Sequence, residues 1–377
     1  MTRYKTEQLL SFEIPYDWDL LTTHFDWLQA LYDCPQDPIY HAEGNVGIHT
    51  RMVVEALFEL QGWQQADAQT RTILFTACLL HDIAKPECTV IEPIEGTDQV
   101  RITSPRHAKK GEKRARQVLA DLPWSHWVKE QICQLVRFHG LPIWFLSKTH
   151  PEKTVIQASL SVNTEWLAWV AEADLRGRIS DTQEEWLERI EFFAEFCREQ
   201  HCFGAARHFA SPHTRFLYFQ KSEVYPDAPI YDNTCVEVFL LCGLPGAGKD
   251  TWIDTYATDL PVVSLDKLRQ ELGVSFKDNQ GKVIQAAQEK AKECLRKQQS
   301  FVWNATNITR QNRKKLIDLF SQYRGSTTIV YLPKPLSVVL KQNREREVVI
   351  KEKVIYNFLG RLEPPTIAEA HRLWVVE

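Results

Sequence analysis

The chain has 377 residues, of which 44% are hydrophobic and 25% charged, and a formal net charge of −4. This length leaves room for two cores, and nine cysteines without a Cys-x-x-Cys pair argue against a disulfide framework or a cysteine zinc site. No apolar run approaches the roughly 18 residues needed to cross a bilayer, so we expect a cytoplasmic protein without membrane partners, and the net charge excludes a global attraction to nucleic acid.

The first part of the chain has the apolar spacing of helices. Between residues 25 and 200, apolar side chains recur three and four residues apart, as in Thr50–Leu60. From 203 to 233 the pattern becomes irregular and contains three prolines, which is typical of a surface connection. We therefore predict an all-α domain at 1–205, a linker at 206–234 and a second domain at 235–377.

The second domain alternates apolar strands with helical segments. Val236–Cys242 is typical of a buried strand, and further short strands are expected at 261–264, 300–303 and 328–331. Because helical segments separate these strands, the sheet should be parallel and the domain α/β.

Six residues of the helical domain have side chains that bind metals, and they lie in apolar or small-residue surroundings. Successive members of the set are separated by 25 to 35 residues, about one helical hairpin, apart from one adjacent pair. Hairpins of this length can bring several ligands to one site. The set is His49, His81, Asp82, His107, His139 and Asp174.

Imidazole and carboxylate together suit divalent transition metals, which activate water for the hydrolysis of phosphoesters. Any one of these histidines, taken alone, could equally be a hydrogen-bonded core residue. The adjacent pair His81-Asp82 favours the metal site.

The segment Leu79–Lys85 resembles the signature of the HD phosphohydrolase superfamily. This resemblance implies a four-ligand metal site made by His49, His81, Asp82 and Asp174. The segment Glu172–Arg178 is similar to the HD domain of bacterial CCA-adding enzymes, which are phosphodiesterases and phosphatases on RNA ends. That likeness implies His107 and His139 as additional ligands. The site would hold one or two ions of Mn, Ni, Co or Zn.

Several basic residues lie close to these ligands in the sequence. Lys85, Arg176 and Arg178 could contact a substrate phosphate or could be structural ion-pair partners. The peptide 106–116 has six basic residues and one acidic residue. It is either a track for a nucleic-acid backbone or a solvated helix face.

A glycine-rich loop follows the first strand of the second domain. The loop runs from Gly243 to Lys249, and the glycines, with Gly246 and Gly248, allow backbone amides to surround a phosphate. The ammonium group of Lys249 adds positive charge, so we expect ATP and Mg²⁺ here. Asp250 occupies the usual place of Ser or Thr and could hold Mg²⁺ through water, while Thr251 could contact a phosphate.

Asp266 follows a strand, and Arg269 lies one helical turn later. The carboxylate could take a proton from an attacking hydroxyl and the arginine could bind an acceptor phosphate, although a helix cap and a surface charge are the alternative. This Asp-x-x-Arg pair resembles the acceptor site of phage and bacterial 5′-hydroxyl polynucleotide kinases. There the aspartate is the general base, and the arginine holds the 3′-side phosphate.

Two later segments are similar to the same kinases. Trp303–Asn307 resembles a segment whose polar side chains approach the active site, although Asn307 could instead start a helix. Arg344 and Arg346 lie in a segment that resembles the kinase lid, whose arginines stabilise the transferring phosphoryl group. The alternative for these arginines is a salt-bridged helix surface.

Taken together, the chain resembles the bacterial HD-Pnk end-healing group. The resemblance implies a 2′,3′-cyclic phosphodiesterase and 2′/3′-phosphomonoesterase joined to an ATP-dependent 5′-hydroxyl polynucleotide kinase, acting on RNA or DNA ends that a separate ligase then seals. One alternative is an HD nucleotidase fused to a nucleoside or small-metabolite kinase. Another is a signalling module in which ATP binding gates the HD site.

Overall fold

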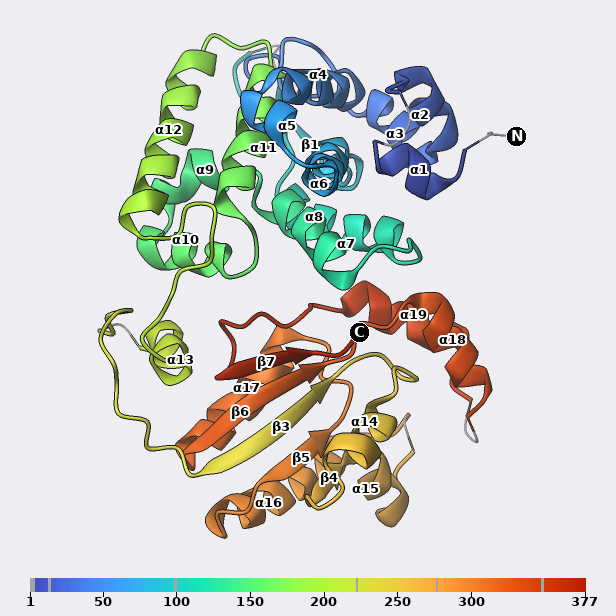
Figure 1. Ribbon diagram of the computed structural model, residues 1–377. Helices are drawn as coiled ribbons and strands as arrows, with labels where there is room; N and C mark the ends of the chain where they lie inside the picture. The colour runs from blue at the N-terminus through green and yellow to red at the C-terminus, as the bar shows by residue number, and fades with distance from the viewer. Residues whose placement is uncertain (1–3, 13–14, 98–99, 222, 276, 347–348) are drawn as a thin grey trace. The chain divides into compact units, whose positions relative to one another are not determined.

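The computed structural model describes residues 4–12, 15–97, 100–221, 223–275, 277–346 and 349–377. The chain forms two compact units, Met1–Arg207 and His208–Glu377, which Figure 1 draws in blue to green and in yellow to red. Within the described residues, no helix combines the length and apolar character that a membrane crossing requires.

The first unit is helical, as the apolar periodicity predicts. Its elements are α1 (Thr6–Leu10), α2 (Trp18–His24), α3 (Asp26–Gln29), η1 (Ala30–Asp33), α4 (Val46–Glu59), α5 (Gln61–Gln65), α6 (Ala68–Leu80), η2 (Lys85–Glu87), α7 (His107–Leu119), α8 (His126–Phe138), α9 (Leu141–Trp144), η3 (Phe145–Ser147), α10 (Pro151–Ser159), α11 (Thr164–Arg176) and α12 (Gln183–Glu199).

Helix α6 forms the centre of this unit. The Asp67 side chain caps its N-terminus by accepting the Thr70 amide at 2.7 Å, and every residue from Ile73 to Leu80 is buried. Helices α4, α8 and α11 pack against α6. The C-terminal end of α6 therefore reaches the middle of the core, where the His81-Asp82 pair follows it.

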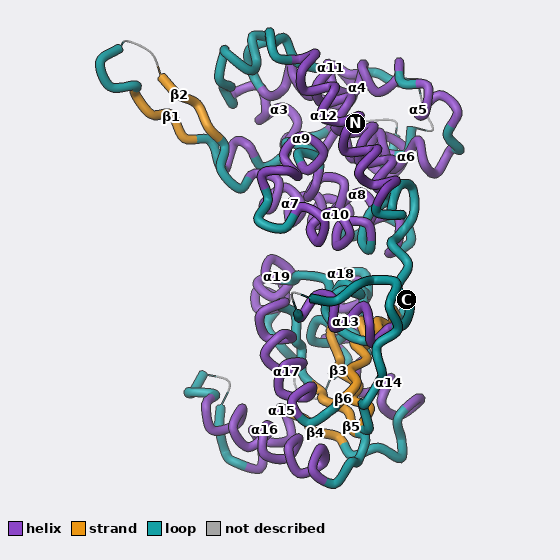
Figure 2. The backbone as a smooth tube through the Cα atoms, turned by 90° about the vertical axis from the view of Figure 1, so that its left-hand side faces the viewer, coloured by secondary structure: helices purple, strands orange, loops and turns teal. Residues whose placement is uncertain are grey.

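A small antiparallel hairpin is inserted in the helical unit, and the sequence analysis did not predict it. Strands β1 (Val90–Pro93) and β2 (Val100–Thr103) pair with Ile91 opposite Ile102, and Figure 2 shows them projecting away from the helices of their unit. The hairpin connects η2, next to the His81-Asp82 pair, with α7. Strands of four residues with an exposed face leave little periodic signal.

The second unit is an α/β domain with a parallel sheet, as predicted. Its five strands lie in the order β4-β5-β3-β6-β7, and each pairs in parallel with its neighbour. Helix α16 packs against β4 and β5, and α17 packs against β6. The elements are α13 (Pro212–Gln220), β3 (Val236–Cys242), α14 (Lys249–Tyr256), β4 (Val262–Ser264), α15 (Leu265–Glu271), α16 (Gly281–Arg296), β5 (Phe301–Asn304), α17 (Arg310–Gln322), β6 (Gly325–Tyr331), α18 (Leu336–Arg344), α19 (Glu352–Arg361) and β7 (Arg372–Val375).

The segment 206–234, expected to be an irregular linker, contains helix α13. Ser211 caps this helix through the Thr214 amide at 2.9 Å, and Pro212 occupies its first position. Phe216 is buried against the sheet core, and its ring stacks on His371 with centroids 4.1 Å apart. The helix is only nine residues long and has prolines at its start and beyond its end, so its apolar residues do not form a long periodic run.

Candidate functional sites

The structure brings the six predicted metal-binding residues together from five helices. His49 is the fourth residue of α4, and Asp174 lies in the last turn of α11. The other four lie at helix ends: His81 and Asp82 directly after α6, His107 at the start of α7, and His139 directly after α8. Five of the six are buried, and the side chain of His107 is 27% exposed.

The histidines are oriented with the same ring nitrogen toward the centre. His81, His107 and His139 each place Nδ1 against the backbone carbonyl three residues earlier, at 2.7, 2.7 and 2.9 Å. A carbonyl only accepts, so Nδ1 carries the proton and Nε2 carries a lone pair. The Nε2 atoms of His49 and His81 lie 3.3 Å apart, as do those of His107 and His139. Paired lone pairs at this distance fit a cation between them.

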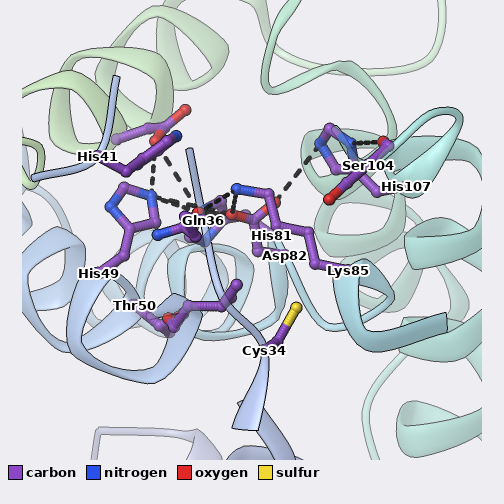
Figure 3. A network of polar contacts seen from close by, with 12 residues as sticks. Cys34, Gln36, His41, His49, Thr50, His81, Asp82, Lys85, Ser104 and His107 are labelled. Atoms are coloured by element: carbon purple, nitrogen blue, oxygen red, sulfur yellow. Dashed lines mark hydrogen bonds and ion pairs between the residues drawn. The ribbon is translucent and has the colours of Figure 1, made fainter. Parts of the chain in front are cut away.

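Asp82 lies between the two histidine pairs. Its Oδ2 lies 3.1 Å from His81 Nε2 and 2.6 Å from Lys85 Nζ, and its Oδ1 lies 3.5 Å from His107 Nε2. Among the described residues, this buried Oδ1 has no hydrogen-bond partner. Figure 3 shows His49 at one end of the network, Asp82 in its middle and His107 at the other end. The donor set therefore offers room for one ion on each side of Asp82.

The groups that could hold these ions are His49 with His81 and Asp82, and Asp82 with His107 and His139. Asp174 joins the first group because its Oδ1 lies 3.0 Å from His49 Nε2. Neutral imidazoles and ionised carboxylates are the ligand forms that bind divalent transition metals.

The electrostatics of the cluster match that requirement in part. Burial would raise the pKa values of both carboxyls, but Lys85 holds the pKa of Asp82, and Arg178 that of Asp174, well below the usual range. Burial lowers the pKa of His139 to about 3, so that histidine is neutral. For His81, burial acts in the same direction but the adjacent Asp82 outweighs it and raises the pKa.

The three basic residues predicted near this site lie in different surroundings. Lys85 is buried, and its Nζ is shared between Asp82 and the Gln36 Oε1, each at 2.6 Å. Arg178 grips Asp174 with two hydrogen bonds, of 3.0 and 2.5 Å. Arg176 instead pairs with Glu172 on the surface of α11. Lys85 and Arg178 therefore contact the ligands directly, whereas Arg176 is held in a surface pair.

The basic peptide 106–116 forms the start of α7, and part of its charge is neutralised. Arg116 pairs with Glu112 and Glu130 in a half-buried cluster, and Arg114 pairs with Glu87 at 3.0 Å. Arg106 and Lys109 remain exposed next to His107. The exposed positive charge is thus concentrated at the N-terminal end of α7, beside the candidate metal centre.

The phosphate loop of the second unit joins β3 to α14. Gly246 and Gly248 have φ angles of +82° and +87°, which favour glycine. Lys249 Nζ lies 2.9 Å from the Leu244 carbonyl and 3.3 Å from the Gly243 carbonyl, so its ammonium curls back over the loop. Burial lowers the pKa of Lys249 to about 8.

The two residues after Lys249 differ in their contacts. Asp250 accepts a hydrogen bond of 2.7 Å from Asn304, which lies at the carboxyl end of β5. Thr251 lies on the exposed side of α14. The carboxylate of Asp250 is therefore fixed at the sheet edge where the loop begins its helix, in the place predicted for a magnesium contact.

The predicted acceptor pair is formed in α15. Arg269 makes an ion pair with Asp266, and its Nε donates to Gln280 Oε1 at 2.7 Å. The charge of Asp266 also acts on the pKa of Lys249, together with that of Arg346, so both groups lie within electrostatic reach of the loop lysine. Gln280 was not predicted, because it stands outside the Asp-x-x-Arg spacing.

The two predicted lid arginines are distinguished by their contacts. The Arg344 side chain is 67% exposed and bonds to Glu352 at 2.8 Å. The charge of Arg346, in contrast, contributes to the lowered pKa of Lys249. Between α18 and α19, the buried Asn343 donates to the Ile350 carbonyl at 2.8 Å and accepts the Ile350 amide at 3.1 Å. These two bonds join the end of α18 to the residues before α19. Asn343 belongs to the lid-like segment, but only the arginines of that segment were predicted as site residues.

The side chain of Asn307 bonds to the backbone of β3. Its Nδ2 donates to the Leu241 carbonyl of β3 at 2.7 Å, and the residue has a left-handed φ of +45°. Helix α17 begins later, with Thr309 as its cap. Asn307 therefore ties the segment after β5 to the end of β3 and does not start the helix, whereas Asn304 of the same segment bonds to Asp250 beside the phosphate loop.

Comparison with known proteins identifies both units. The family model described as HD domain matches residues 46–159, and the one described as AAA domain matches residues 238–365. The chain therefore contains an HD domain followed by a P-loop kinase-like domain.

The individual relatives are distant. The chain is 24% identical over 135 residues to an L-seryl-tRNA(Sec) kinase from Methanococcus maripaludis, a match of 34% of this chain and 53% of the relative. The chain thus spans about half the length of this curated relative. A solved structure of a proposed kinase from Chloroflexus aurantiacus is 16% identical with a TM-score of 0.34, over 38% of this chain and 86% of that one. A gluconokinase from Sinorhizobium meliloti is 17% identical with a TM-score of 0.29, over 38% and 83%.

Proposed function

We propose that this chain is an end-healing enzyme for broken nucleic acid, with two active sites on one polypeptide. The HD domain would open a 2′,3′-cyclic phosphate and remove the remaining phosphomonoester. The kinase domain would transfer the γ-phosphate of ATP to a 5′-hydroxyl. The observation that carries this proposal is that one chain holds both a buried histidine–carboxylate cluster and a phosphate loop with the Asp266–Arg269 ion pair in electrostatic reach of its lysine.

In the HD domain, His49, His81, Asp82 and Asp174 would hold one ion, and Asp82, His107 and His139 a second. When bound, such ions activate water and neutralise charge on a phosphoester. Lys85 and Arg178 keep the carboxylates ionised. Because His107 is the most exposed ligand, the substrate phosphate would approach from its side, where Arg106 and Lys109 offer positive charge.

In the kinase domain, Lys249 and Arg346 would bind the phosphates of ATP, and Asp250 would orient Mg²⁺ through water. Asp266 would accept the proton of the attacking hydroxyl. Arg269 would hold a phosphate on the 3′ side of that hydroxyl. Gln280 supports this role because its Oε1 accepts a hydrogen bond of 2.7 Å from Arg269 Nε and so holds the guanidinium beside Asp266.

A second candidate is an HD nucleotidase joined to a kinase for a small metabolite. The names of two similar proteins, a gluconokinase and a kinase of L-seryl-tRNA(Sec), fit a small and an RNA-linked acceptor respectively. A third candidate is a signalling module, in which ATP binding gates the HD site without phosphoryl transfer. The acceptor arginine distinguishes the first two, because a small acceptor without a neighbouring phosphate does not need it.

The experiment compares Arg269→Ala with Lys267→Ala, an exposed neighbour in α15. With a 5′-hydroxyl oligonucleotide, R269A should raise the acceptor KM about tenfold or more, the value of one charge-assisted phosphate contact, and K267A should not. The proposal also requires that Asp266→Ala abolish kinase activity and spare the phosphoesterase, and that His81→Ala do the reverse. Equal acceptor use by R269A and wild type would favour the small-metabolite alternative.

A further inference from the structure

A buried carboxylate outside the predicted ligand set, Glu43, lies directly behind His49. It stands between η1 and α4, and its side chain is 1% exposed. Its Oε1 lies 2.8 Å from His41 Nδ1 and 3.0 Å from His49 Nδ1, and its Oε2 accepts the Ile179 amide at 3.0 Å. Both oxygens therefore have donors, and Figure 3 shows His41 and His49 side by side in this part of the network.

Glu43 and the Gly177 carbonyl together fix which nitrogen of His49 carries the proton. His49 Nε2 faces Asp174 at 3.0 Å and His81 Nε2 at 3.3 Å, so it is the nitrogen available to a metal. Its Nδ1 must then be the donor. The other histidines of the cluster place Nδ1 against a carbonyl three residues earlier, but His49 lies inside α4, where those carbonyls accept helix bonds. His49 Nδ1 instead faces two acceptors from outside its own helix, the Gly177 carbonyl at 3.1 Å and Glu43 Oε1 at 3.0 Å.

Glu43 also connects this ligand to the last one. The Ile179 amide bonds to Glu43, and the Ile179 carbonyl accepts the Ala42 amide at 3.0 Å, so the loop after α11 is tied to the segment before α4. That loop carries Arg178, which grips Asp174. One carboxylate thus holds together the supports of two ligands that are 125 residues apart in the sequence.

An alternative is that His41, Glu43 and His49 themselves hold an ion, since their ligand atoms lie close enough. An ion there would need the Nδ1 lone pairs of both histidines. Both Nδ1 atoms instead lie at hydrogen-bond distance from a carboxylate oxygen that can only accept. His49 would moreover have to lose both ring protons to serve the two sites. The geometry therefore favours orientation over ligation.

We propose that Glu43 is a positioning residue of the HD site: it holds His49 as an Nδ1 donor, presents Nε2 to the metal and so sets the metal affinity. This inference rests on the proposed metal centre. A carboxylate behind a histidine ligand makes that ligand more basic and fixes its ring, and losing such a partner typically weakens metal binding about 10- to 100-fold. The kinase domain provides an internal reference, because its activity should not depend on Glu43.

The test uses the full chain freed of metal and titrated with Mn²⁺, the free ion being measured by electron paramagnetic resonance. The variants are Glu43→Gln, which keeps an uncharged acceptor at position 43, Glu43→Ala, which leaves His49 only the Gly177 carbonyl, and Glu55→Gln, which changes an exposed carboxylate of α4. We expect Mn²⁺ binding to weaken at least tenfold in E43A and less in E43Q, with E55Q like wild type. Thermal unfolding and kinase activity show whether each variant is folded.

Affinity of folded E43A within twofold of wild type would overturn the positioning role. The loss of one bound ion with unchanged affinity for the rest would also overturn it, in favour of ligation by Glu43. If wild type binds no Mn²⁺, Ni²⁺, Co²⁺ or Zn²⁺, the metal centre itself is refuted, and the role of Glu43 with it. A graded loss from wild type through E43Q to E43A supports the proposal.

Discussion

Replacing Arg178 by Met removes the guanidinium that pairs with Asp174, and it should destabilise the metal-free protein far more than the metal-loaded one. Asp174 is 1% exposed and Arg178 is 14% exposed, so the pair is almost fully removed from water. Breaking a buried pair from one side costs about 3–5 kcal/mol because the remaining charge has no partner. The partial exposure of Arg178 places the expected loss near about 3 kcal/mol.

A bound divalent ion would supply the positive charge that Arg178→Met removes. The cost of the substitution should therefore fall by about half or more when Mn²⁺ saturates the site, since the carboxylate is then paired. For a unit of this size, about 3 kcal/mol corresponds to a shift of roughly 6–12 °C in the unfolding midpoint. Calorimetry on the full chain, with EDTA and then with Mn²⁺, measures both shifts for the transition that responds to metal.

The matched control is Arg176→Met, two residues earlier on α11. Arg176 and Glu172 are 49% and 28% exposed, so their pair should contribute about 0.5 kcal/mol or less. Equal midpoints for R178M and R176M without metal would refute the argument from burial. A loss in R178M that is the same with and without Mn²⁺ would refute the placement of a cation at Asp174.

Three further predictions concern the kinase domain. Arg346→Ala should lower kcat about 100-fold or more, because one charge donor at the transferring phosphoryl group contributes about that much. Arg344→Ala loses only a surface pair with Glu352, so its kcat should stay within about threefold of wild type. The transfer of radiolabel from ATP measures both rates. Asn343→Ala removes the side chain that bonds to the Ile350 amide and carbonyl, and it should reduce kcat about tenfold or more. The control Gln342→Ala should leave kcat unchanged. Similar kcat values for the two variants would contradict this prediction. Burial lowers the pKa of Lys249 to about 8, so its ammonium group is present below that pH and lost above it. The affinity of the wild type for ATP should therefore fall as pH rises from 7 to 9, and that of Lys249→Met should stay level. Calorimetric titration with ATP at several pH values measures both dependences.

The candidate ligand cluster was predictable because its residue types, histidine and aspartate, are those that bind metals. His81-Asp82 is an adjacent pair at the end of an apolar helix, and the other ligands follow at hairpin spacing. The packing of α4, α6, α8 and α11 is what turns that spacing into one site. In the second unit, a buried strand followed by Gly243 to Lys249 likewise fixed the place of the phosphate loop in the α/β fold.

The residues behind the ligands were not predictable from spacing. Glu43 and Gln36 act through contacts with His49 and Lys85 that depend on how distant segments pack. Strand β7 and the hairpin of β1 and β2 are short and partly exposed, so neither has a long apolar period. Asn307 shows the converse case: it lies in the kinase-like segment Trp303–Asn307, yet its side chain bonds to the backbone of β3.

The most direct test of the two-site account follows both ends of one RNA. A short RNA with a 5′-hydroxyl and a 2′,3′-cyclic phosphate is incubated with the full chain, ATP, Mg²⁺ and Mn²⁺ or Ni²⁺, and the products are separated on a denaturing gel. The account predicts a 5′-phosphate and a free 2′,3′-diol on the same strand, with H81A leaving the cyclic phosphate and D266A leaving the 5′-hydroxyl. An RNA unchanged at both ends by folded, metal-loaded protein would contradict it.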